Sequence, residues 1–296
     1  MLWQNIRRFH MKVAVIGAGL MGSGIAQCFA QAGYEVINID TFEAAIEKAD
    51  ANVKKLFEKK VAKGKMTEEQ KNEILGRLAY SRSFEDVSGA ELVVEAVPEK
   101  IELKKDVFAK LDTLTDPNAI LVSNTSGLSI SEIAAATKRP EKVMGAHFFY
   151  PAPVMKLLEL IRGIATDDAT YATVKEIAAK IGKTTVDAPE LPGFMVNRIL
   201  VPMQNEAAFM VMEGSRPEDV DNAMKLGCNF PMGPLELTDF VGVDIMLGTM
   251  RGLYEGFRDS KYRPCPLLEN MVKAGHLGKK SGQGFYRYDE NGNRIG

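Results

Sequence analysis

A histidine and a glutamate twelve residues apart are the residues of this sequence best suited to acid–base chemistry. His147 is one of three histidines in the chain and ends a strand-like apolar run. Glu159 stands inside a second apolar run, Leu157–Ile161, where a carboxylate is costly to bury unless a partner pairs with it. The turn Pro151–Pro153 can fold the two runs back on each other. Although a histidine at a strand end is more often packed than catalytic, we predict that Glu159 orients His147 as a general acid and base.

A glycine-rich loop near the start of the chain predicts a dinucleotide site. The expected strand Lys12–Ile16 runs directly into this loop, in which glycines allow a tight turn, close approach of the backbone to a pyrophosphate and close packing of the next helix. A second strand ends at Asp40, where a carboxylate can bond the ribose hydroxyls of NAD, and no arginine follows that could accept a 2′-phosphate. The predicted cofactor is NAD, bound by Gly17, Gly19, Leu20, Met21, Gly22 and Asp40.

A second polar segment follows another expected strand, Ile120–Ser123. It reads SNTSGLS and contains Asn124 and Ser126. Because the carboxyl ends of strands in a doubly wound sheet face the ligand crevice, polar residues of this segment are expected to contact a bound ligand, and Asn124 is a predicted cofactor residue. Read alone, the serines of this segment fit a helix-capping loop nearly as well.

The elements that must position these residues follow the pattern of βαβ units. Strand-like runs alternate with helical periodicity over the first 190 residues, which predicts an α/β fold with a Rossmann-type doubly wound sheet. After Pro192-Gly193 the strand signals disappear, and we expect an all-helical second domain. The predicted domains are 1–189, with a helical-hairpin insertion, and 190–296. The expected strands are 12–16, 35–39, 78–81, 92–97, 120–123, 143–149 and 157–161, and the expected helices of the first domain are 21–32, 42–63, 67–76, 100–114, 130–137 and one from Asp167 or Asp168 to 181.

Composition excludes several other classes of protein. With 296 residues, 46% of them hydrophobic, the chain has enough material for two folded domains. The formal net charge of −2 gives no basic field for nucleic acid, and no apolar run is long enough for a membrane span. Three cysteines without metal or disulfide spacing fit a reducing, cytoplasmic compartment, and no metal site is expected. Residues 1–10 are predicted to be an unstructured extension or the product of an upstream start codon, with a fragment of an organelle address as the alternative.

These motifs together resemble the 3-hydroxyacyl-CoA dehydrogenases. The resemblance runs from Met11 to Tyr288. It is closest to the short, single-function bacterial members that act on 3-hydroxybutyryl-CoA. The segments that carry it are GAGLMGSGIA, SNTSGLSI, HFFYPAPVMKLLEL, PGFMVNRIL, FPMGPLELTDFVGVD and GKKSGQGFY. The chain departs from the family at Tyr150, where an asparagine usually stands, and this departure bears on the shape of the acyl pocket.

The resemblance implies roles for particular residues. His147 becomes the acid/base residue, Glu159 its orienting partner, and Ser126 and Asn197 the residues that hold the substrate. Further positions lie near the nicotinamide end of the cofactor, namely Glu99 and Lys104. The lysines of the helix 42–63 are expected to attract the phosphates of coenzyme A, with Lys55 and Lys63 as candidates, although an individual lysine there is as often a solvated surface residue.

The reaction implied is the NAD-dependent interconversion of an (S)-3-hydroxyacyl-CoA and a 3-ketoacyl-CoA, with 3-hydroxybutyryl-CoA and acetoacetyl-CoA as expected substrates. One alternative is a dehydrogenase of a small hydroxy acid without coenzyme A, and another is a non-catalytic NAD-binding protein.

The segments Phe194–Met212 and Pro234–Leu253 carry more apolar residues than one buried helix face needs, which predicts a homodimer.

Overall fold

The computed structural model describes residues 11–295 of the chain. The predicted extension at residues 1–10 lies outside the described residues. The chain divides into two compact units, Met1–Glu190 and Leu191–Gly296.

The first unit is built on one sheet in the order β3-β2-β1-β4-β5-β6-β7-β8. From β3 to β6 all neighbouring strands are parallel, and the order reverses between β1 and β4, so the predicted doubly wound sheet is confirmed. β-branched and other apolar residues fill these short runs because both faces of the sheet are covered. The strands are β1 (Lys12–Ile16), β2 (Glu35–Ile39), β3 (Leu78–Ser81), β4 (Leu92–Glu95), β5 (Ile120–Ser123), β6 (Val143–Phe148), β7 (Leu157–Arg162) and β8 (Thr184–Ala188).

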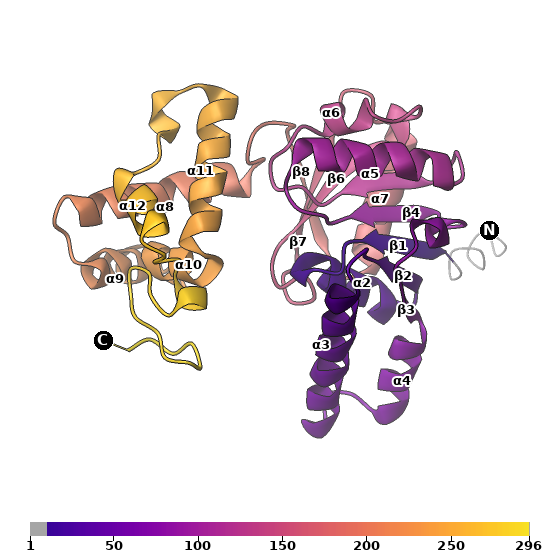
Figure 1. Cartoon of the computed structure of the whole chain (residues 1–296), viewed down its shortest axis with the longest axis horizontal. Coiled ribbons are helices and arrows are strands. Elements are labelled where there is room, and N and C mark those ends of the chain that lie inside the picture. The colour runs from indigo at the N-terminus through magenta and orange to yellow at the C-terminus, as the bar shows by residue number, and fades with distance from the viewer. Residues whose placement is uncertain (1–10, 296) are drawn as a thin grey trace. The chain divides into compact units, whose positions relative to one another are not determined.

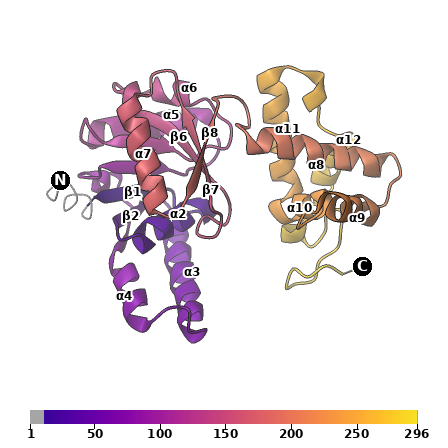
Figure 2. The same cartoon turned by 180° about the vertical axis from the view of Figure 1, so that it is seen from behind.

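Helices cover both faces of this sheet. Helices α5 (Ile101–Leu114) and α6 (Ile130–Ala134) lie in front of it in Figure 1, and α7 (Asp168–Lys180) lies across the opposite face in Figure 2. Helix α2 (Leu20–Gln31) shares the face and the apolar core of α7. Alternate strand residues point to opposite faces, so His147 and Glu159 lie on the side of α5, away from the core that α2 and α7 cover.

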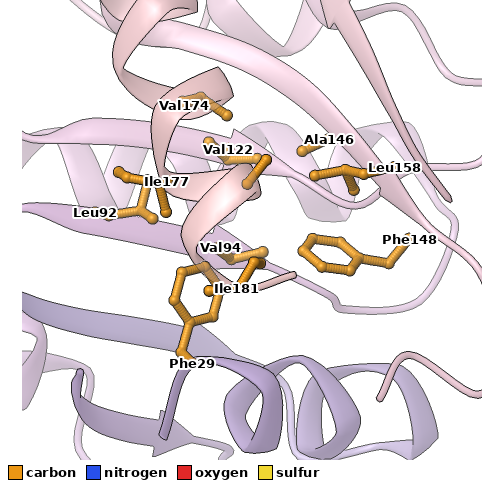
Figure 3. Close-up of a pocket in the computed structure, with 11 residues that line it drawn as sticks. Phe29, Leu92, Val94, Val122, Ala146, Phe148, Leu158, Val174, Ile177 and Ile181 are labelled. Carbon is orange, nitrogen blue, oxygen red and sulfur yellow. The ribbon is translucent and has the colours of Figure 1, made fainter. Parts of the chain in front are cut away.

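A cavity between α2, α7 and the sheet is lined only by apolar side chains, with Phe29 and Ile181 near its lower side in Figure 3. Such a lining offers no polar group to orient a ligand or to hold water. The cavity therefore belongs to the core and is not a candidate site.

The helical insertion is a hairpin of α3 (Glu43–Ala62) and α4 (Glu68–Gly76) that projects from the sheet (Figure 1). The predicted capping box is present, since Gln70 N–H donates to Thr67 Oγ1 and Thr67 N–H donates to Gln70 Oε1. The exposed lysines of α3 line its solvent side.

The sheet departs from the sequence prediction at its edge. Strand β8, which pairs in parallel with β7, was not among the expected strands. An edge strand pairs on one side only, and its residues Thr184–Asp187 are exposed or half-buried, so it lacks the apolar run used to recognise the other strands. Helix α6 is also shorter than the predicted 130–137, ending at Ala134.

The second unit contains five α-helices among the described residues, and they enclose their own apolar core. Its last described segment contains a short 3-10 helix, Lys279–Ser281, and isolated β-bridges that join residues between Gly278 and Arg294. Buried Asp239 holds this segment by accepting hydrogen bonds from the N–H groups of Phe285 and Tyr286. The helices are α8 (Val196–Met212), α9 (Pro217–Cys228), α10 (Pro234–Val241), α11 (Val243–Phe257) and α12 (Pro266–Lys273).

The start of α7 generates a stability prediction. Asp167, rather than Asp168, caps this helix, and the Thr170 N–H that it accepts lowers the pKa of Asp167 to about 2. A carboxyl whose pKa is lowered by folding stabilises the protein above its unfolded pKa, and that stabilisation is lost as the pH falls towards the folded value. We expect Asp167→Ala to reduce the free energy of unfolding by about 1 kcal/mol at neutral pH, and the difference to shrink below about pH 4.

Urea unfolding followed by circular dichroism measures this difference. The control is Asp168→Ala, since the Asp168 side chain is 94% exposed and does not cap the helix. An equal loss in both variants would contradict the capping role.

Candidate active site

The acid–base pair predicted from the sequence is formed by the one antiparallel pairing in the sheet. Strand β7 runs antiparallel to β6 in a register that sets His147 opposite Glu159. The Nδ1 atom of His147 lies 2.7 Å from Oε2 of Glu159, and Glu159 is fully buried. The ring of Phe149 packs against the imidazole at a centroid distance of 4.4 Å. A carboxylate at Nδ1 fixes the ring orientation and favours the protonated imidazole.

The glycine loop has the shape that a pyrophosphate requires. An added Cβ at Gly22 would lie 1.9 Å from the carbonyl oxygen of Gly17, so only glycine allows α2 to start this close to β1. At Gly19, the N-terminal cap of α2, an added Cβ would meet no atom within 4 Å. The backbone at Gly19 is thus open to an approaching anion at a helix N-terminus, and the loop fits a dinucleotide. Leu20 is 67% exposed beside it.

Asp40 directly follows β2 and holds the same loop. Its carboxylate accepts the N–H of Ala18 at 2.7 Å and that of Phe42 at 2.9 Å. Two backbone donors fix the side chain at the edge where the ribose of a dinucleotide lies in this fold, and a carboxylate retains further acceptor positions for hydroxyl groups.

The polar segment after β5 is tied to both neighbouring strands. Asn124 Oδ1 accepts the N–H of Phe148, next to the acid–base histidine. Glu99 Oε1 accepts hydrogen bonds from Thr125 Oγ1 at 2.6 Å, from the Ser126 N–H at 2.7 Å and from Ser126 Oγ at 3.0 Å. The predicted residues Glu99, Asn124 and Ser126 thus lie together at the carboxyl ends of β4 and β5.

Lys104 lies beside two glutamates of the first unit. Its side chain is 1% exposed, with Nζ 2.7 Å from Glu95 and 3.3 Å from Glu99. Lys104 forms a buried ion pair with Glu95, a residue that the sequence analysis missed, and its place near the nicotinamide end of the cofactor stays a prediction. Glu95 also accepts from Ser123 Oγ. The signal for it was present, because Glu95 is a carboxylate inside an apolar strand, as Glu159 is.

The remaining predicted residues belong to other elements. Asn197 is in the first turn of α8, in the second unit. Lys55 lies on the exposed side of α3, and Lys63 is the exposed C-terminal cap of that helix. The roles of Asn197, Lys55 and Lys63 stay predictions.

A search of residues 11–295 finds no group of three or more His, Cys, Asp or Glu side chains that could hold a metal ion. Within the same range, no helix has the length and apolarity to cross a membrane.

The sheet order, the glycine loop and the acid at the end of β2 define a dinucleotide-binding protein of the doubly wound class. Comparison with known families makes this specific. Residues 12–191 match the NAD binding domain of 3-hydroxyacyl-CoA dehydrogenase, and residues 193–288 match the C-terminal domain of the same family. The chain belongs to the 3-hydroxyacyl-CoA dehydrogenase family, and its cofactor is NAD.

Individual relatives are similar over nearly their whole length. The chain is 48% identical over 278 residues to the 3-hydroxybutyryl-CoA dehydrogenase of Bradyrhizobium diazoefficiens, covering 94% of this chain and 95% of that protein. It is 48% identical over 281 residues to that of Clostridioides difficile, covering 95% and 100%. The crystal structure of (S)-3-hydroxybutyryl-CoA dehydrogenase from Ralstonia eutropha superimposes with a TM-score of 0.91 at 44% identity, covering 95% and 100%.

The contrast between Gly19 and Gly22 gives a prediction for the loop. We expect Gly19→Ala to leave the thermal midpoint nearly unchanged and to weaken NADH binding by about tenfold or more, because the new methyl group points into the space that the pyrophosphate needs. Gly22→Ala is expected to lower the thermal midpoint, since its Cβ collides with backbone. Thermal melts and NADH fluorescence titration distinguish the two effects. Normal NADH affinity in Gly19→Ala would show that this loop does not bind the cofactor.

Proposed function

We propose that this chain is an NAD-dependent dehydrogenase that interconverts (S)-3-hydroxybutyryl-CoA and acetoacetyl-CoA. The observation that carries the proposal is the buried His147–Glu159 pair, in a chain that matches both domains of the family. Relatives that are named for this substrate and match over nearly the whole chain support the choice of a short acyl group.

His147 is the acid–base residue in this proposal. Neutral His147 takes the proton of the 3-hydroxyl group through Nε2, and Glu159 stabilises the imidazolium through Nδ1. When bound, oxidised NAD supplies the nicotinamide ring that accepts a hydride from C3 of the substrate. Ser126 bonds the substrate's 3-oxygen, and Asn197 holds the thioester side. In the reverse direction the protonated imidazole returns the proton to the 3-oxygen.

The glycine loop, Asp40 and the segment after β5 hold the cofactor in this proposal. The backbone at Gly17, Gly19, Leu20, Met21 and Gly22 receives the pyrophosphate, Asp40 the ribose, and Glu99 and Asn124 lie toward the nicotinamide. On α3, Lys55 and Lys63 provide positive charge for the phosphates of coenzyme A.

The three cysteines, Cys28, Cys228 and Cys265, are free thiols, which supports a reducing, cytoplasmic compartment.

A direct assay tests the proposed substrate. We expect NADH oxidation with acetoacetyl-CoA, a much slower rate with free acetoacetate, and a lower kcat/KM with NADPH than with NADH because Asp40 repels a 2′-phosphate. Equal rates with acetoacetate and acetoacetyl-CoA would favour the alternative, a dehydrogenase of small hydroxy acids. NADH binding without turnover of either compound would indicate a non-catalytic binding protein.

The assigned role of His147 gives a second test. We expect His147→Gln to lower kcat with acetoacetyl-CoA by about 10²–10⁴-fold, the usual contribution of a general acid, with NADH affinity close to that of the wild type. Glu159→Gln should lower kcat as well, because a neutral amide does not favour the imidazolium. A His147→Gln variant that kept more than about a tenth of the wild-type kcat would exclude the acid–base assignment.

We propose in addition that the second unit forms a homodimer. Several large apolar side chains of α8, α10 and α11 are exposed, and a group of this size on helices usually meets a partner. They are Ile199 (71% exposed), Met210 (44%), Met212 (46%), Phe240 (46%), Val241 (47%), Ile245 (54%) and Tyr254 (43%).

Sedimentation equilibrium at micromolar concentration is expected to give twice the mass of one chain. Ile199→Lys should shift the protein toward the single-chain mass, since it places a charge in the apolar surface that the proposed dimer buries. Ile164→Lys is the matched control, because Ile164 is 93% exposed in the first unit. A wild-type mass of one chain would exclude the dimer.

A further inference from the structure

A cluster of three charged side chains lies beside the acid–base pair without being part of it. It consists of Glu95 at the end of β4, Glu99 in the following loop and Lys104 in the first turns of α5. The Glu95 side chain is 0% exposed, that of Lys104 is 1% exposed, and that of Glu99 is 40% exposed. Burial of the Glu95 and Lys104 charges beside a third charge is costly, so the arrangement needs a physical reason.

Hydrogen bonds define the charge of the Glu95–Lys104–Glu99 cluster. Glu95 accepts from Lys104 Nζ, from the Val97 N–H and from Ser123 Oγ, each at 2.7 Å. Every one of these partners is a donor, as ionised carboxylates require.

The partners of Glu99 are donors as well. Its Oε1 atom accepts hydrogen bonds from Thr125 and Ser126, and its Oε2 atom lies 3.3 Å from Lys104 Nζ. Two carboxylates and one ammonium leave the cluster with a net charge of one negative unit. Because Lys104 bonds Glu95 at the shorter distance and both are buried, the excess negative charge resides on half-exposed Glu99.

The sheet topology places this charge on the nicotinamide side of the cofactor. A doubly wound sheet binds one nucleotide over each half, and the two halves meet where the strand order reverses, between β1 and β4. Asp40 on β2 marks the adenosine half. Glu99 follows β4 and bonds the segment after β5, so it belongs to the other half.

We propose that the net negative charge of the Glu95–Lys104–Glu99 cluster strengthens binding of the oxidised cofactor relative to the reduced one. The inference rests on the proposed function only through the NAD site. The nicotinamide ring is positively charged in NAD⁺ and neutral in NADH, and the rest of the two molecules is the same. A fixed negative charge on the nicotinamide side therefore acts on one redox form and not on the other.

Lys104 sets the size of this effect. It compensates Glu95, so that one unit of charge rather than two remains at the sheet edge. Its ammonium donates hydrogen bonds to Glu95 and to the carbonyl of Val97 and forms an ion pair with Glu99, and these contacts hold it in place. Lys104 is thus a positioning residue that acts on the cofactor through Glu99.

The test is the ratio of the dissociation constants of NAD⁺ and NADH, measured by calorimetry and by NADH fluorescence without substrate. Glu99→Gln removes the excess charge and keeps a side chain that can still accept hydrogen bonds. We expect the ratio Kd(NAD⁺)/Kd(NADH) to rise by about 3- to 30-fold, the range for one unit charge acting over several ångströms between the dielectric of water and about 20. The change should lie mainly in the affinity for NAD⁺.

Two controls separate charge from structure. Ser126→Ala removes a hydroxyl group that donates to Glu99 without changing the charge, and Glu102→Gln removes a carboxylate that is 76% exposed on α5, the helix that carries Lys104. Both are expected to leave the ratio within about twofold of the wild type, since water screens the exposed charge.

An unchanged ratio in Glu99→Gln, with both redox forms still bound, would overturn the proposal and leave the proposed function intact. An equal rise in Ser126→Ala would also overturn it, because the effect would then be structural. Failure of the wild type to bind either redox form would overturn the proposed function together with this inference.

Discussion

The candidate active site depends on one buried carboxylate. Glu159 has no exposure to solvent, and its side chain meets the imidazole of His147 at 2.7 Å. A carboxylate in such a place is stable only beside a donor, so the pairing of β6 with β7 and the presence of histidine at that register support each other. The antiparallel direction of β7 is what creates this register, since it sets His147 directly opposite Glu159. The proposed general acid is thereby placed on a strand of the sheet, at the end where the loops proposed to bind the cofactor begin.

The carboxyl edge of the parallel strands gathers the other functional groups. Loops that follow β1, β2, β4 and β5 carry the glycine turn, Asp40, Glu99 and Ser126, which come from parts of the sequence up to about a hundred residues apart. Hydrogen bonds between these loops hold them in place. Asp40 fixes the glycine loop through Ala18, and Glu99 fixes the segment after β5 through Ser126. Asp40 and Glu99 thus each accept a backbone hydrogen bond that fixes a neighbouring loop, and each lies at the carboxyl ends of the strands. These hydrogen bonds explain why carboxylates recur at this edge of the sheet.

The second unit is also organised around buried carboxylates, and these carboxylates hold backbone segments of that unit together. Asp239 accepts backbone N–H groups of the last segment, and burial raises the pKa of this carboxyl while those hydrogen bonds oppose the rise. Asp221 accepts the N–H groups of Leu235 and Glu236 at the start of α10 and the hydroxyl of Tyr286. Two of the motifs that mark the family, those around Asp239 and Tyr286, are therefore joined in one hydrogen-bond network. Their residues serve the architecture of the helical unit.

The sequence by itself determined the features that depend on neighbouring residues. The glycine turn, most strands and helices, and the capping box of Thr67 and Gln70 follow from local periodicity and local hydrogen bonds. Glu159 was found because a charge inside an apolar run demands a partner. Only the tertiary structure decided which distant groups meet. It chose Lys104 as the partner of Glu95, since an apolar run around a glutamate calls for a partner without identifying it. It also added β8, whose exposed and half-buried residues form a strand because they pair with β7. Such pairings depend on the arrangement of several elements in space, and local sequence carries no record of that arrangement.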